Sequence, residues 1–211
     1  MFRGAVSEVT VASLDVRQQK LVENAHLALE RGQLDYALDA CAQILPAAPG
    51  CLPVRRLQRS AQLRRFRTQN FRLGRELGVG VTAFFSRADK INPGAVLTRA
   101  EQWLARAPTS VPALRLLADA AARLDLPETA AFALAAIREL QPGNQANLLA
   151  LGEAWLVAGQ PAEAISVADY MLAARPADAS ALNLLRKASV AQTVAQGHWE
   201  SSATFRDKLR R

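Results

Sequence analysis

The stretch that decides the fold reads VPALRLLADAAARLDLPETAAFALAAIRELQPGN (111–144), followed directly by QANLLALGEAWLVAGQPAEAISVADYMLAARPAD (145–178). Both segments have 34 residues, and equivalent positions hold the same residue in several pairs, among them Leu114 with Leu148, Leu117 with Leu151, Ala130 with Ala164, and Pro142 with Pro176. Within each segment apolar residues recur every three or four positions in two runs, which a turn containing Pro127 or Pro161 separates. The pattern predicts two antiparallel helices per segment, repeated along the chain.

The second segment resembles the tetratricopeptide repeat (TPR) family, whose repeat is a helix–turn–helix unit of 34 residues. The matching residues are Leu151-Gly152, Trp155, Gly159, Ala164 and Pro176. The second helix departs from the family pattern at Ala168 and Met171, and the preceding segment departs at Ala118, Ala121 and Asp125. The resemblance implies an all-α fold, a right-handed superhelix (α-solenoid) of about four TPR-like repeats with a concave binding surface.

The same period divides the rest of the chain. We expect an N-terminal arm at 1–17 that is frayed as far as about Leu14, a first repeat at 18–51, an arginine-rich inserted helix at 52–76 and three repeats at 77–178. A capping helix closed by Gly197 and a tail complete the chain at 179–211. All of these parts are predicted to form one continuous solenoid domain.

The arginine-rich segment 52–76 contains eight arginines and no acidic residue before Glu76, whereas the whole chain has a net charge of +7. The basicity is therefore local. On a helical wheel Val54, Leu57 and Ala61 share one face, and the apolar stripe then changes sides near 60–62. The arginines behind the second stripe form a predicted basic ridge: Arg64, Arg65, Arg72 and Arg75.

Three interpretations of this segment stay open. The arginines are a solvated surface, as most runs of charge are, or they bind the phosphates of a nucleic acid or ribosome. Phe66 and Phe71 lie among the arginines, where they either stack on bases or pack in a core. In the third interpretation the apolar segment 77–85 follows the basic one as a peripheral membrane anchor does.

The sequence contains no pattern typical of catalysis. Cys41 and Cys51 lack metal-ligand spacing, His26 and His198 lie far apart, and we find no phosphate-binding loop or nucleophile elbow. We therefore expect no enzyme activity, no cofactor and no small-molecule substrate. The first twenty residues lack the apolar core of a secretory signal, so we predict a cytoplasmic protein.

Binding of another protein is the function that the resemblance implies. In TPR proteins the first helix of each repeat lines the concave groove, and a peptide or helix of the partner lies there. The corresponding groove residues are Arg115, Asp119, Arg123, Leu149, Glu153, Leu156, Val157, Asn183 and Lys187. We expect an interaction scaffold or assembly factor, with the nucleic-acid and membrane interpretations as alternatives. Trp199 and Phe205 in the tail either fold back on the last repeat or contact a partner.

Overall fold

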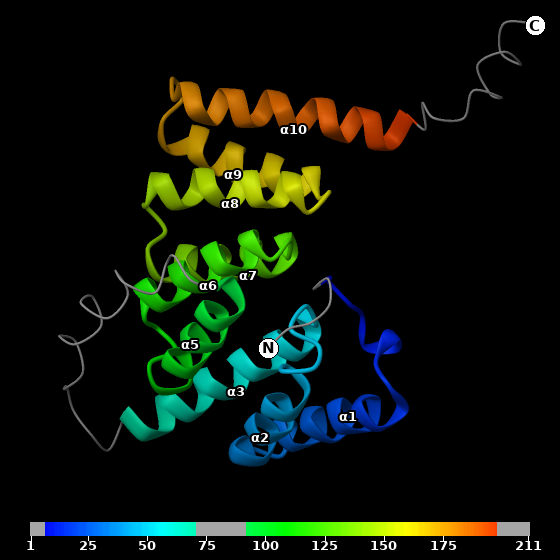
Figure 1. Cartoon of the computed structure of the whole chain (residues 1–211). Helices are drawn as coiled ribbons and strands as arrows, with labels where there is room; N and C mark the ends of the chain where they lie inside the picture. The colour runs from blue at the N-terminus through cyan, green and yellow to red at the C-terminus, as the bar shows by residue number, and fades with distance from the viewer. Residues whose placement is uncertain (1–6, 71–91, 198–211) are drawn as a thin grey trace, which may run out of the picture. The chain divides into compact units, whose positions relative to one another are not determined.

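The computed structural model describes residues 7–70 and 92–197, and it forms two compact units, residues 1–141 and 142–211. Among the described residues all regular structure is helical (Figure 1). The all-α prediction is thus confirmed. That the predicted parts form one continuous solenoid domain stays a prediction.

The first unit contains a short 3-10 helix and six α-helices in the described residues. Their bounds are η1 (Val11–Ser13), α1 (Val16–Glu30), α2 (Leu34–Ile44), α3 (Leu52–Asn70), α5 (Pro93–Arg106), α6 (Val111–Arg123) and α7 (Pro127–Leu140). Helix α2 packs against both α1 and α3, and α6 packs against both α5 and α7. A core cluster lies among η1, α1, α2 and α3, and it includes Ala25, Cys41, Ile44 and Val54.

The second unit contains α8 (Gln145–Val157), α9 (Pro161–Ala174) and α10 (Ala179–Gly197), coloured yellow to orange-red in Figure 1. Helix α9 packs against α8 and α10, and α10 also contacts α8. The same relationship joins α1, α2 and α3 in the first unit, where α3 contacts both α2 and α1. A helix occupies the position of the predicted capping helix, as α10, and its role as a cap stays a prediction.

The turns inside the helix pairs share one geometry. Gly32, Asp125 and Gly159 have positive φ angles of 75°, 59° and 69°. After each of them the next backbone N–H donates to a carbonyl five residues earlier, as in Gln160 to Trp155 at 2.9 Å. This pattern is a Schellman motif, which ends a helix with one residue in the left-handed conformation. Glycine adopts that conformation freely, and Asp tolerates it better than most side chains do.

The N-terminal arm was predicted to fray as far as about Leu14, and this prediction is wrong for residues 7–14. The backbone N–H of Val9 donates to the carbonyl of Gly50 at 3.1 Å, and Leu14 is buried. A Cβ atom on Gly50 would lie 2.1 Å from the carbonyl oxygen of Ser7, so only glycine permits this approach. Residues 7–14 are therefore packed into the first unit, and the reason is tertiary contact rather than local helix propensity.

Candidate partner-binding surfaces

The predicted groove residues of the second unit lie on α8 and α10, which contact each other. Glu153 and Val157 are exposed on α8, and Leu149 and Leu156 are half-buried. On α10, Asn183 and Lys187 are exposed, and the side chain of Asn183 accepts a hydrogen bond from Arg186 at 3.0 Å. We call the surface formed by these six predicted residues the α8–α10 face.

The two helices of this face approach closely because Gly152 has no side chain. A Cβ atom at Gly152 would lie 2.3 Å from Cδ2 of Leu184, which is almost completely buried. The Leu-Gly pair that suggested the TPR resemblance therefore has a packing role in this chain. It holds α10 against α8 and so fixes the α8–α10 face.

Sequence reasoning missed two residues of this surface. Val190 and Val194 follow Asn183 and Lys187 at steps of three and four residues, so all four share one stripe of α10. Both valines are 60% exposed. The helical period alone could have found them, by continuing the Asn183–Lys187 stripe along the rest of the predicted capping helix. They extend the apolar part of the α8–α10 face.

The other predicted groove residues lie in the first unit. Arg115, Asp119 and Arg123 occupy one stripe of α6 at four-residue spacing. Arg115 is half-buried, whereas Asp119 and Arg123 are exposed. Their part in a groove stays a prediction.

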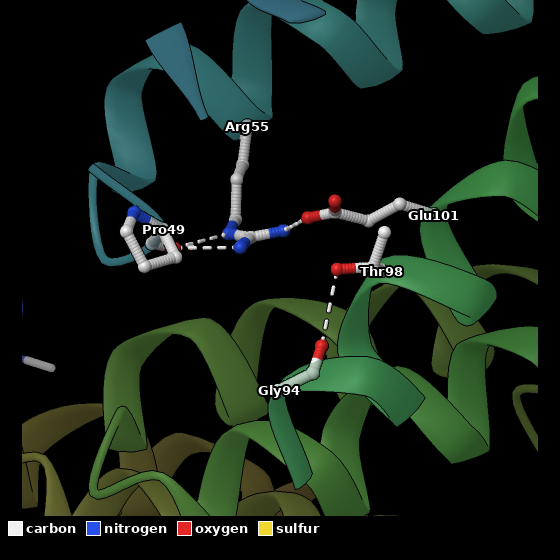
Figure 2. Close-up of polar contacts among 5 residues, drawn as sticks. All are labelled: Pro49, Arg55, Gly94, Thr98 and Glu101. Carbon is white, nitrogen blue, oxygen red and sulfur yellow. Dashed lines mark hydrogen bonds and ion pairs between the residues drawn. The ribbon is translucent and has the colours of Figure 1, made fainter. Parts of the chain in front are cut away.

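Two of the arginines at the start of α3, Arg55 and Arg59, are buried rather than part of a solvated surface. Arg55 is 3% exposed, and its guanidinium group donates two hydrogen bonds to the carbonyl of Pro49, at 2.9 and 2.6 Å. The same group forms an ion pair with Glu101 of α5 (Figure 2). On α5, the hydroxyl of Thr98 donates to the carbonyl of Gly94 at 3.1 Å. Arg55 thus links α3 to α5.

Arg59 and Gln62 continue this buried polar stripe one and two turns along α3. Arg59 donates to the carbonyl of Pro108 at 3.0 Å, and burial lowers the pKa of its guanidinium group, while the nearby Glu139 raises it. Arg55, Arg59, Gln62 and Glu101 also line a cavity of about 20 Å³ with Leu114 and other apolar residues. A cavity of this size with polar walls fits one water molecule.

The predicted basic ridge is only partly described. Arg64 is exposed and donates to the carbonyl of Leu29 at 2.9 Å. Arg65 donates to Asp35 at 3.2 Å and to the carbonyl of Ala105 at 3.1 Å. Arg72, Arg75 and the predicted membrane-binding segment 77–85 lie outside the described residues. The ridge and both alternative functions stay predictions.

The titratable groups of the described residues show no assembled reaction centre. Burial raises the pKa of Cys41 to about 12 and also raises the pKa of Cys51, and both thiols are free and completely buried. His26 is exposed and lies 3.6 Å from Glu30. No group of three or more metal-ligating side chains occurs in 7–70 and 92–197. None of the helices described has the length and apolar character needed to span a bilayer.

Comparison with known proteins gives structural neighbours only. No family model matches the chain, and no curated protein matches it. A mutant form of MamA has 18% sequence identity and a TM-score of 0.40, over 91% of this chain and 95% of that one. A second MamA crystal structure has 16% identity and a TM-score of 0.37, over 86% and 95% of the two chains. A thermophilic TPR protein of Thermus thermophilus, TTC0263, has 15% identity and a TM-score of 0.35, over 90% and 96%.

At such identities and TM-scores the similarity concerns the helical fold and assigns no activity or partner.

Proposed function

We propose that this protein is a non-catalytic protein-binding scaffold or assembly factor. In this proposal a helix or extended peptide of the partner binds on the α8–α10 face. The observation that supports it is the exposure of three valines on two contacting helices: Val157 is 72% exposed, and Val190 and Val194 are each 60% exposed.

The composition of the face supports a peptide ligand. Removing apolar surface from water contributes about 25 cal/mol of favourable free energy for each Å². A partner that covers these side chains would therefore gain binding free energy. Single exposed valines are common, but here they lie beside Glu153 and Lys187, whose charges provide a polar rim. Protein-binding surfaces commonly combine an apolar centre with such a rim, and amphipathic helices bind to surfaces of this kind.

The test is partner capture by paired variants. The double variant Val157→Asp with Val190→Asp places two charges in the apolar part of the face without removing a buried contact. The matched control is Val16→Asp with Leu27→Asp on α1, where the side chains are 68% and 48% exposed. We expect the first variant to lose the proteins that wild type and control co-purify from the native source, with the helical circular dichroism unchanged. Equal capture by both variants would refute the proposal.

A further inference from the structure

A second surface, in the first unit, has a different chemistry. One stripe of α5 carries Arg99, Gln102, Trp103 and Arg106, at steps of three, one and three residues. The buried face of the same helix is formed by other residues, among them Val96 and Leu104. The stripe therefore lies beside the core-facing side of α5.

This stripe lines a cavity with one more arginine. Arg65 of α3 reaches α5, where it donates to the carbonyl of Ala105 at 3.1 Å. Arg65, Arg99 and Arg106, with Gln102, Trp103 and Ala105, line an open pocket of about 490 Å³. This volume lies within the range of pockets that hold a small ligand or a few residues of a peptide, roughly 300–1,000 Å³. We call it the α5 pocket.

The charge of the α5 pocket is strongly positive. Three of its six lining residues are arginines and none is acidic. Asp35 forms an ion pair with Arg65 at 3.2 Å, but its side chain is 85% exposed and does not line the pocket. Glu101, also on α5, pairs with Arg55 and lines the separate small cavity. Guanidinium groups bind carboxylates with two parallel hydrogen bonds, and an indole ring offers an apolar surface between them.

We propose that the α5 pocket binds an acidic segment of a partner protein, with two carboxylate side chains on either side of an apolar one. This inference rests on the proposed function and names the chemistry of a second contact. Along the helix axis Arg99 and Arg106 are roughly 10 Å apart, since each residue rises 1.5 Å. An extended Glu-x-Leu-x-Glu segment places its two acidic residues on one side about 13 Å apart, with Leu between them. Long arginine side chains span the difference.

A polypeptide fits this site better than a nucleic acid does. Binding of a nucleic acid draws on positive charges that follow many phosphates along a track. The basic track that α3 can offer is interrupted, because Arg55 and Arg59 on this helix are buried and bonded to Glu101 and to backbone carbonyls. A short acidic segment needs only the local cluster.

The experiment measures the binding of a fluorescein-labelled peptide, Gly-Glu-Ala-Leu-Ala-Glu-Gly, to the full chain by fluorescence anisotropy. The comparison peptide has Gln in place of both Glu residues. The test variant is Arg99→Gln with Arg106→Gln, and the single variant Arg106→Gln removes one exposed side chain only. The matched control is Arg56→Gln with Arg67→Gln, which removes the same charge from two exposed positions of α3. Circular dichroism checks that each variant is folded.

We expect the acidic peptide to bind the control as it binds wild type, and to bind the double pocket variant roughly tenfold more weakly. Binding should weaken as salt screens the charges, and the Gln peptide should not bind. Equal weakening by the pocket and control variants would overturn the inference, since it would indicate diffuse attraction. Tighter binding of a single-stranded RNA of equal charge, lost in the pocket variant, would overturn the choice of a protein ligand.

The outcome is independent of the test of the proposed function. If the peptide fails to bind while Val157→Asp with Val190→Asp still abolishes partner capture, the α5 inference falls and the scaffold function stands. If capture is unaffected but the peptide binds through Arg99 and Arg106, the assignment of the α8–α10 face falls instead.

Discussion

The backbone N–H of Thr129 donates to Oε1 of Glu8 at 2.8 Å, across 121 residues of the chain. Thr129 is in the first turn of α7, and the residue before this helix, Leu126, provides no side-chain cap. Glu8 therefore caps α7 from a distant part of the sequence, where the helix dipole favours a carboxylate. The contact ties the N-terminal arm to a helix more than a hundred residues away.

The Glu8 contact predicts a pH dependence of stability. Burial is the largest influence on the pKa of Glu8 and raises it, and the charges of Glu128 and Asp125 also raise it, while hydrogen bonds from the Thr129 and Glu128 backbone oppose the rise. With the pKa raised on folding, the contribution of Glu8 to stability is fully present below its unfolded pKa near 4.5 and is lost as the pH rises through the folded pKa. We expect Glu8→Gln to remove this loss.

The measurement is urea unfolding of wild type and Glu8→Gln between pH 3.5 and 7. At pH 7 the free energy of unfolding of Glu8→Gln should exceed that of wild type by no more than about 1 kcal/mol, because the carboxylate is partly solvated. This difference should vanish near pH 4. A variant that is less stable than wild type at pH 7 by a similar amount would mean that the charged cap outweighs the cost of burying it.

The buried ion pair of Arg55 with Glu101 predicts that the substitution Glu101→Gln strongly lowers stability. In Glu101→Gln the guanidinium group of Arg55 stays buried and loses its counter-charge, which typically costs about 3–5 kcal/mol. Since Glu101 itself is 20% exposed, we expect a value at the lower end of this range. Chemical unfolding measures it, with the exposed Glu23→Gln on α1 as the control. A loss no greater than that of the control would show that the pair does not hold α3 to α5.

The turn at Asp125 predicts a stabilising substitution. Asp125 occupies the left-handed position that Gly32 and Gly159 occupy in the equivalent turns. Asp125→Gly should raise the free energy of unfolding by about 0.5–1 kcal/mol, because it relieves the strained φ angle and removes a negative charge near Glu8. The reverse change, Gly159→Asp, should lower stability by a similar amount. Thermal unfolding of the two variants checks both signs.

The burial of the two cysteines predicts that their thiols react slowly with reagents in solution. Cys41 and Cys51 are completely buried, and burial raises the pKa of both thiols, that of Cys41 to about 12. The reactive thiolate is therefore scarce at pH 8. In the native protein we expect a disulfide reagent to label both residues only as fast as the first unit unfolds, and at once in urea. Rapid labelling under native conditions would contradict the packing of the α1–α3 core.

The helices of 111–178 were predictable because local signals agree there. Apolar residues follow the helical period, and Pro127, Pro161, Asp125 and Gly159 mark the turns. The exposure of Glu153 and Val157 on α8 and of Asn183 and Lys187 on α10 follows from the same period, since it separates the stripe that faces α9 from the opposite one. Val190 and Val194 were missed only because the stripe was not continued along α10.

The role of the arginines was not predictable from local sequence. Arg55 and Arg59 find their partners 46 and 49 residues away, in Glu101 and the carbonyl of Pro108. One signal was available: Arg55, Arg59 and Gln62 share a stripe beside Val54 and Leu57. The sequence does not distinguish a buried polar stripe from a solvated one, because the difference depends on which helix covers the stripe. The contact of Glu8 with Thr129 was hidden for the same reason.

The proposed scaffold function is tested most directly by photo-cross-linking from the α8–α10 face. A photoreactive phenylalanine analogue replaces Val190, and in the control protein it replaces Val16 on α1, which is exposed to a similar degree. After irradiation in the native source, we predict one distinct protein adduct from position 190 that is absent from position 16. The same adducts from both positions, or none from position 190, would contradict the account.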